Sequence, residues 1–158
     1  MTTTLDIDIF LTSWLERHGF DAEADYGLDF CVDLDSNVIT YTFVVPSAHD
    51  EKFFELCHQI CPDIIACDNF ILSFFHEIGH IETEADFDEK DWEKYWRDCE
   101  KYTADDGIMA YYTNPIELAA TTWACEYIIN HVEEVKEFRD GYVKLATKFF
   151  KENGIELE

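Results

Sequence analysis

The sequence has few basic residues for its length. Its 158 residues include 11 Lys and Arg against 35 Asp and Glu, which gives a formal net charge of −24. An electric field of this sign repels nucleic acid and anionic membrane surfaces, and it attracts cations, basic peptides and the basic faces of DNA-binding proteins. We therefore expect no direct binding to nucleic acid or to membranes, and a preference for basic partners.

Chain-breaking residues and linkers are also scarce. There are three Pro and six Gly, and no repeat, low-complexity tract or Pro/Gly/Ser-rich linker interrupts the chain. Hydrophobic residues make up 47 % of the sequence and aromatic residues 16 %, which is enough to build a core despite the charge. These features predict a single domain over residues 1–158.

The sequence lacks the patterns that direct a chain to or across a membrane. The start, MTTTLDIDIF, has no basic region followed by an apolar run, and no apolar stretch reaches the roughly 20 residues of a spanning helix. We expect a soluble, cytoplasmic protein. Its six cysteines are then predicted to be reduced and mostly buried.

One segment with two cysteines and a histidine resembles a metal-binding motif. In CHQIC, Cys57, His58 and Cys61 lie within a helical pattern in which Phe54, Cys57 and Cys61 share one face. Zinc needs a complete ligand set, and no second Cys/His pair of suitable spacing follows. The pattern therefore favours core packing over a metal site.

Periodicity along the chain predicts an α+β fold. Residues 5–19 form an amphipathic pattern with a threonine ahead of it, residues 28–46 alternate as a β-hairpin with a turn at DSN, and helical patterns follow to the end. A small antiparallel sheet with surrounding helices is the expected architecture.

The helical patterns have recognisable limits. We expect one helix from Ser47 or Asp50 to Cys61, a short strand over 63–67, a helix capped by Asp68, a charged helix within 83–107, and a helix capped by Thr113 or Asn114. The inward stripe of the charged helix is predicted to hold Trp92, Tyr95, Trp96 and Cys99, and the last helix is predicted to break or kink near Gly141.

The helix predicted after Asp68 carries the sequence HEIGH. On a helix, His76 and His80 project from the same face about 6 Å apart and can hold one zinc ion through their imidazole nitrogens. Glu77 can reach a water molecule at the metal and take its proton. The pattern arises by chance in about one of forty chains of this composition, so a third ligand must support it.

Two residues can supply that third ligand. Asp86 gives a spacing similar to that of short zinc peptidases whose aspartate ligand follows the second histidine by six residues. Glu117 lies on a later helix, beside the inward stripe of Ile116, Ala120 and Trp123, where small alanines allow close approach of another helix. A carboxylate at that edge needs a partner, although a first-turn Glu is also favoured by the helix dipole.

The combination of HEIGH with ELAATTWA resembles the ImmA/IrrE-type metallopeptidases. In that family a HExGH helix precedes a helix with the pattern Glu-x-x-Ala-(Asn/Asp)-x-(Phe/Trp)-Ala, and here Glu117, Ala120, Trp123 and Ala124 match while Thr121 replaces Asn or Asp. The resemblance implies a minimal zincin-like domain of the gluzincin type. It also implies His76, His80 and Glu117 as zinc ligands and Glu77 as the general base.

The function expected from these patterns is that of an intracellular zinc metalloendopeptidase. Its substrate would be a protein or peptide, and members of the family are associated with the cleavage of DNA-binding repressors in mobile elements, which suits the acidic surface. Candidate donors to the oxyanion are His131, Tyr112 and Tyr111.

A second function class fits the charge better. The chain could be an acidic DNA mimic of a phage or other mobile element, whose carboxylates imitate phosphates and occupy a DNA-binding protein, with zinc absent or only structural. A third class, a peptidase fold that keeps zinc for structure alone, lies between the two.

Overall fold

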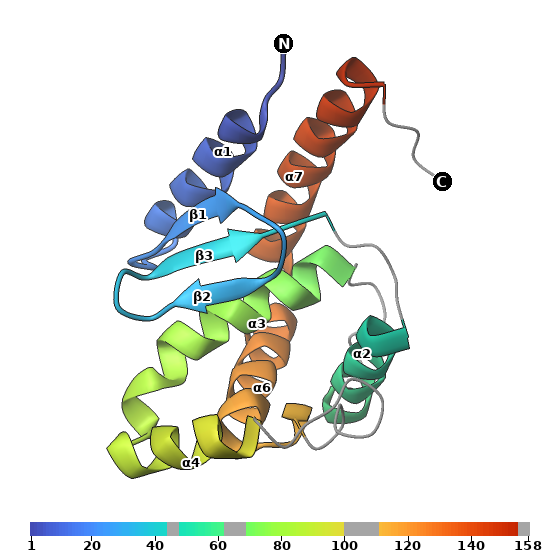
Figure 1. The fold of residues 1–158 in the computed structure, drawn as a ribbon. Coiled ribbons are helices and arrows are strands. Elements are labelled where there is room, and N and C mark those ends of the chain that lie inside the picture. The colour runs from blue at the N-terminus through green and yellow to red at the C-terminus, as the bar shows by residue number, and fades with distance from the viewer. Residues whose placement is uncertain (44–47, 62–68, 100–110, 155–158) are drawn as a thin grey trace. The chain divides into compact units, whose positions relative to one another are not determined.

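The computed structural model describes residues 1–43, 48–61, 69–99 and 111–154 (Figure 1). The chain forms two compact units, of which the first combines residues 1–42 with 131–158 and the second comprises residues 43–130. The two units are defined by contacts within each, so one domain over 1–158 stays a prediction. None of the helices in the described ranges has the length and apolar character needed to cross a bilayer.

The first unit begins with α1 (Thr4–Arg17), as predicted. Thr3 and Asp6 form a capping box, in which the Asp6 carboxylate accepts the backbone N–H of Thr3 at 2.7 Å and the Thr3 hydroxyl accepts that of Asp6. Beyond the helix, Gly19 has φ +82°, a conformation that favours glycine. The threonine cap and the terminal glycine are therefore both confirmed.

The helix α7 (Val132–Glu152) packs on α1 within the same unit. The buried ring of Trp14 meets Phe138 edge-on at 4.9 Å between centroids. The predicted break near Gly141 is wrong, because α7 continues through it. A Cβ at Gly141 would overlap the ring of Phe10, so the glycine makes room for α1 instead of ending a helix.

The sheet of this unit has the strands β1 (Glu23–Tyr26), β2 (Cys31–Asp33) and β3 (Val38–Tyr41) in the order β1-β3-β2. The antiparallel hairpin β2–β3 is confirmed, with Asn37 in the turn at φ +55°. The prediction of a wholly antiparallel sheet is wrong, since β1 pairs with β3 in parallel. The α+β class is confirmed, but with a mixed sheet.

The second unit is helical in its described residues. Its elements are α2 (Ala48–Ile60), α3 (Asn69–Thr83), the 3₁₀ turn η1 (Glu84–Asp86), α4 (Glu89–Cys99) and α6 (Pro115–Asn130). In Figure 1, α3 and α6 lie side by side, and this pair makes the most extensive contact in the unit. The predicted start at Ser47, the cap at Asp68 and the strand over 63–67 lie outside the described residues.

The CHQIC segment packs as predicted. Cys57 and Cys61 are buried while His58 is exposed, so the histidine does not join the cysteines. The described cysteines are free thiols, and Cys125 of α6 is buried with its thiol 3.9 Å from the carbonyl oxygen of Cys57. The segment belongs to the core between α2 and α6.

The predicted inward stripe of α4 is correct only in part. Tyr95 is 6 % exposed, but Trp96 is 62 % exposed, so the inward assignment of Trp96 is wrong. The ring of Trp96 packs edge-on against that of Tyr95 at 5.1 Å between centroids. The contact of α4 with α6 is small, and Tyr95 is the one residue of α4 that is buried.

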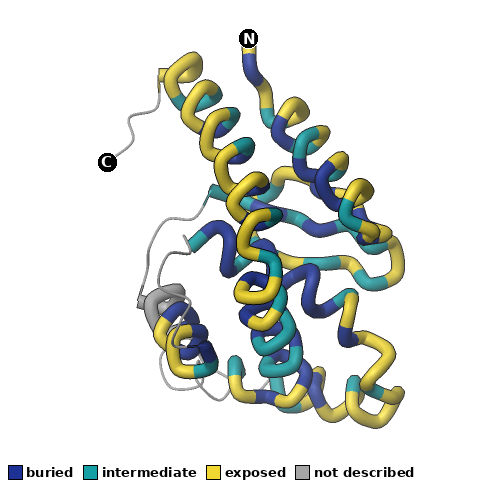
Figure 2. The backbone as a smooth tube through the Cα atoms, turned by 180° about the vertical axis from the view of Figure 1, so that it is seen from behind, coloured by how far each residue is buried: buried dark blue, intermediate teal, exposed yellow. Residues whose placement is uncertain are grey.

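The helices α3 and α6 approach closely at one point. α3 is buried along almost its whole length (Figure 2), and a Cβ at Gly79 would overlap the backbone carbonyl oxygen of Ala120. Glycine costs about 1 kcal/mol relative to alanine within a helix. A glycine is required at this position because the backbone of α3 lies directly against that of α6.

We predict that Gly79→Ala destabilises the protein by about 1–3 kcal/mol, since overpacking against a backbone carbonyl outweighs the gain in helix propensity. Urea unfolding measures the change. Gly141→Ala is the matched control: it also replaces a glycine within a helix, but its Cβ meets the end of the Phe10 ring, which can rotate away. A loss of stability in the control as large as that in Gly79→Ala contradicts the prediction.

Candidate metal centre

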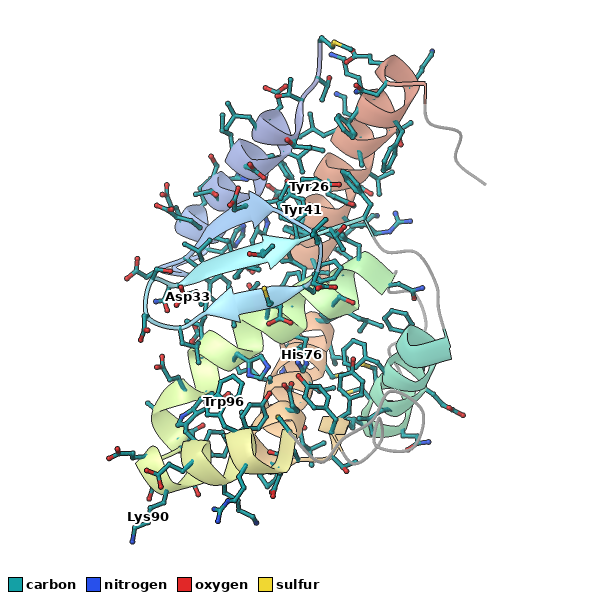
Figure 3. The ribbon with its side chains drawn as sticks, in the orientation of Figure 1. Tyr26, Asp33, Tyr41, His76, Lys90 and Trp96 are labelled. Carbon is teal, nitrogen blue, oxygen red and sulfur yellow. The ribbon has the colours of Figure 1, made fainter. Side chains whose placement is uncertain are left out.

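The helix α3 presents HEIGH to the interior of the second unit. His76, Glu77 and His80 are 5 %, 8 % and 8 % exposed. The position of His76 on α3 can be followed in Figure 3. The helix ends at Thr83, whose hydroxyl donates to the carbonyl oxygen of Gly79 at 2.8 Å. Imidazoles buried to this degree require polar partners.

The start of α6 supplies that partner. Pro115 is the first helical residue, and the side-chain oxygen of Asn114 accepts the backbone N–H of Ile116 at 3.1 Å, which confirms Asn114 as the cap. Glu117 follows in the first turn, where the helix dipole favours a carboxylate, and only 2 % of it is exposed. The cap therefore fixes where this carboxylate enters the interior.

The two histidines converge on one oxygen of Glu117. Nε2 of His76 lies 2.8 Å from Oε2, and Nε2 of His80 lies 2.9 Å from the same atom. The ligand atoms of the three residues lie within 4.8 Å of one another, and they are the one group among the described residues that can hold a metal ion. In tetrahedral zinc sites neighbouring ligand atoms are about 3.3 Å apart, so an ion requires an opening of roughly 0.5 Å.

The hydrogen bonds of Thr121 favour the metal-binding form of His76. The Thr121 hydroxyl donates to the backbone carbonyl of Glu117 at 3.1 Å, so it accepts the Nδ1–H of His76 at 2.8 Å. A neutral His76 then has its lone pair on Nε2, directed at a carboxylate oxygen. Because two lone pairs at 2.8 Å repel, a proton or a metal cation must lie between them, and the residues fit a cation.

Electrostatics within the group favour bound positive charge. Burial opposes ionisation of Glu117, but hydrogen bonds and charges from His76 and His80 outweigh it and hold the pKa of Glu117 well below its usual range. Burial would lower the pKa of His80, yet the hydrogen bond and charge of Glu117 prevail and raise it. Both shifts favour positive charge between the two imidazoles and the carboxylate.

Glu77 lies in the same buried region, but its pKa is shifted in the opposite direction to that of Glu117. Burial raises the pKa of Glu77, and the charges of His76 and His80 offset part of this rise. A buried carboxyl group with a raised pKa beside two imidazoles is suited to accept a proton and return it.

Aromatic rings surround the group. His76 meets Phe53 of α2 edge-on at 5.3 Å and Tyr112 at 6.4 Å between centroids. On the other side, the Tyr95 hydroxyl donates to Oε1 of Glu117 at 2.6 Å, and the Tyr111 hydroxyl lies 3.4 Å from that of Tyr95. Burial and the charge of Glu117 raise the pKa of both tyrosines, which keeps them protonated as donors.

The structure brings together most of the predicted site residues. His76, Glu77, His80, Glu117 and Tyr112 all lie in the second unit around one buried group. Two other candidates are different: Asp86 is exposed and outside the metal-binding group, and His131 belongs to the first unit.

Two polar partners of the group, Thr121 and Tyr95, were not expected from the sequence. Thr121 lies at the position where the resembling family has Asn or Asp, and this match in position could have indicated a polar role for Thr121. No spacing within the acidic helix indicated Tyr95. Comparisons with protein-family models, curated proteins and solved structures found no match to this chain.

We predict about one metal ion per chain in protein purified without chelator, and a clear loss of that metal in Glu117→Ala, because two imidazoles alone hold an ion weakly. Plasma mass spectrometry of the purified proteins measures the content. Asp86→Ala is the matched control and should keep its metal. A variant lacking Glu117 that binds as much metal as the wild type, or loss in the Asp86 variant, contradicts this ligand set.

We also predict a pH dependence of metal affinity, because a proton and a metal compete for Nε2 of His80. Affinity should rise as pH increases through the raised pKa of His80, above 6.5. Protonated His80 also stabilises the metal-free protein. This contribution is complete below pH 6.5 and is lost as pH rises through the raised pKa of His80. Chelator competition and thermal unfolding measure the two effects. Affinity that stays constant between about pH 6 and pH 9 contradicts the competition.

Proposed function

We propose that this protein is a zinc-dependent endopeptidase of the gluzincin type, with His76, His80 and Glu117 as zinc ligands and Glu77 as general base. The convergence of both Nε2 atoms on one buried carboxylate oxygen is the observation that supports the proposal most strongly. Two imidazoles and one carboxylate are a ligand set that suits catalytic zinc. The resemblance of HEIGH and ELAATTWA to ImmA/IrrE-type peptidases points the same way.

The roles of the chain's own groups follow from their surroundings. When bound, zinc supplies Lewis acidity, which activates water and polarises a peptide carbonyl. Glu77 takes a proton from the attacking water and delivers it to the leaving amine, and its raised pKa suits both transfers. Tyr112, whose ring lies beside His76, is our candidate donor to the developing oxyanion.

The substrate we propose is a basic protein, such as a DNA-binding regulator of a mobile element. The supporting observation is the net charge of −24, which raises the local concentration of basic chains and speeds their association. Such steering weakens as salt increases. Cleavage of basic substrates should therefore be more salt-sensitive than metal binding.

An acidic DNA mimic remains the second candidate, because the charge alone favours it. A mimic acts by occupying a DNA-binding protein, so it should displace that protein from DNA without cutting it. The carboxylates responsible would be on the surface, and Glu77 is buried. The effect of a mimic should thus be unchanged in Glu77→Gln.

We predict that Glu77→Gln lowers peptide cleavage by about 10²- to 10⁴-fold while its metal content stays at the wild-type level, since the amide cannot accept the proton. The substrate probe is a synthetic peptide mixture of both charge signs, with new N-termini identified by mass spectrometry. Wild type should cut basic peptides, and a chelator should stop it. Equal cleavage by both proteins contradicts Glu77 as the base, and no cleavage of any peptide by zinc-loaded wild type favours the mimic.

A further inference from the structure

The acidic helix α4 contributes one side chain to the metal centre. Tyr95 lies between the histidines and Glu117 in sequence, and its hydroxyl donates to Oε1 of Glu117 at 2.6 Å. Both residues are buried, with exposed fractions of 6 % and 2 %. Hydrogen bonds of a neutral donor to a buried carboxylate are short and strong.

The two oxygens of Glu117 therefore have different partners. Oε2 faces both histidines, whereas Oε1 faces the tyrosine. A carboxylate without such a partner can bind a metal through both oxygens and fill the position that water needs. A hydroxyl on Oε1 holds that oxygen away from the metal and leaves the position open.

The packing around Tyr95 fixes where its hydroxyl points. Its ring meets Trp92 and Trp96 edge-on at 5.6 Å and 5.1 Å between centroids. The hydroxyl of Tyr111 lies 3.4 Å from that of Tyr95, and Tyr111 also hydrogen-bonds to the Glu117 side chain. These contacts limit the positions that the Tyr95 side chain can adopt.

We propose that Tyr95 is a positioning residue that holds Glu117 as a one-oxygen ligand and so preserves the open position of the metal centre. The assignment rests on the metal centre of the proposed function. It gives α4, which separates the HEIGH helix from the Glu117 helix in sequence, a role in the chemistry of the site.

The test compares wild type with Tyr95→Phe, which keeps the ring and removes the hydroxyl. We expect zinc affinity, measured by chelator competition, to fall about 10- to 100-fold. We also expect the cobalt-substituted variant to lose visible absorption intensity, because a second carboxylate oxygen raises the coordination number above four. Tyr111→Phe, which removes the second tyrosine hydroxyl bonded to Glu117, should also lower zinc affinity, but less than Tyr95→Phe does.

Tyr41→Phe is the matched control. The hydroxyl of Tyr41, in the first unit, donates to the Asp8 carboxylate at 2.5 Å, and Tyr41 is buried, but Asp8 is outside the metal-binding group of the described residues. Tyr41→Phe should unfold at a lower urea concentration than the wild type, without any change in zinc affinity or cobalt absorption.

Three outcomes would overturn the assignment. If Tyr95→Phe keeps the zinc affinity and the cobalt absorption of the wild type, Tyr95 is a packing residue only and the metal centre is intact. If Tyr95→Phe does not fold, unchanged affinity in Tyr111→Phe shows that the tyrosine hydroxyls bonded to Glu117 do not support it as a ligand, which overturns the assignment. A wild-type protein that binds neither zinc nor cobalt overturns the proposed function as well, so the failures are distinguishable.

Discussion

The close approach of α3 and α6 is the constraint on which the candidate metal centre depends. Gly79 lies against the backbone of Ala120, in the turn of α3 between the two histidines. Metal–ligand distances tolerate deviations of only about 0.2 Å, whereas any side chain at position 79 would force the helices apart by more than that. The missing Cβ thus lets Glu117 of α6 reach His76 and His80 of α3.

The buried polar group is costly to the fold and is best explained by its chemistry. A buried carboxylate and two buried imidazoles stabilise a protein less than apolar side chains of the same volume commonly do. Here every observed neighbour of Glu117 is a donor or a potential cation, including Tyr95 on Oε1. Thr121 orients His76 from behind. Such a set, with Glu77 of raised pKa beside it, is typical of functional sites.

Local signals in the sequence predicted the parts of the site, and long-range packing determined the rest. The HEIGH helix, the cap at Asn114 and the hairpin depend on neighbouring residues, so their patterns could be recognised. The parallel pairing of β1, the exposure of Trp96 and the continuous helix at Gly141 depend on elements distant in sequence. Tyr95 was expected only as a core residue, because its partner Glu117 lies on another helix.

The most direct measurement is X-ray absorption at the zinc edge of the zinc-loaded protein. We predict nitrogen and oxygen neighbours at about 2.0–2.1 Å, with the outer-shell scattering of two imidazoles and no sulfur. Sulfur at about 2.3 Å would place the metal on cysteines such as Cys57, Cys61 or Cys125 and would contradict the assignment of the ion to His76, His80 and Glu117.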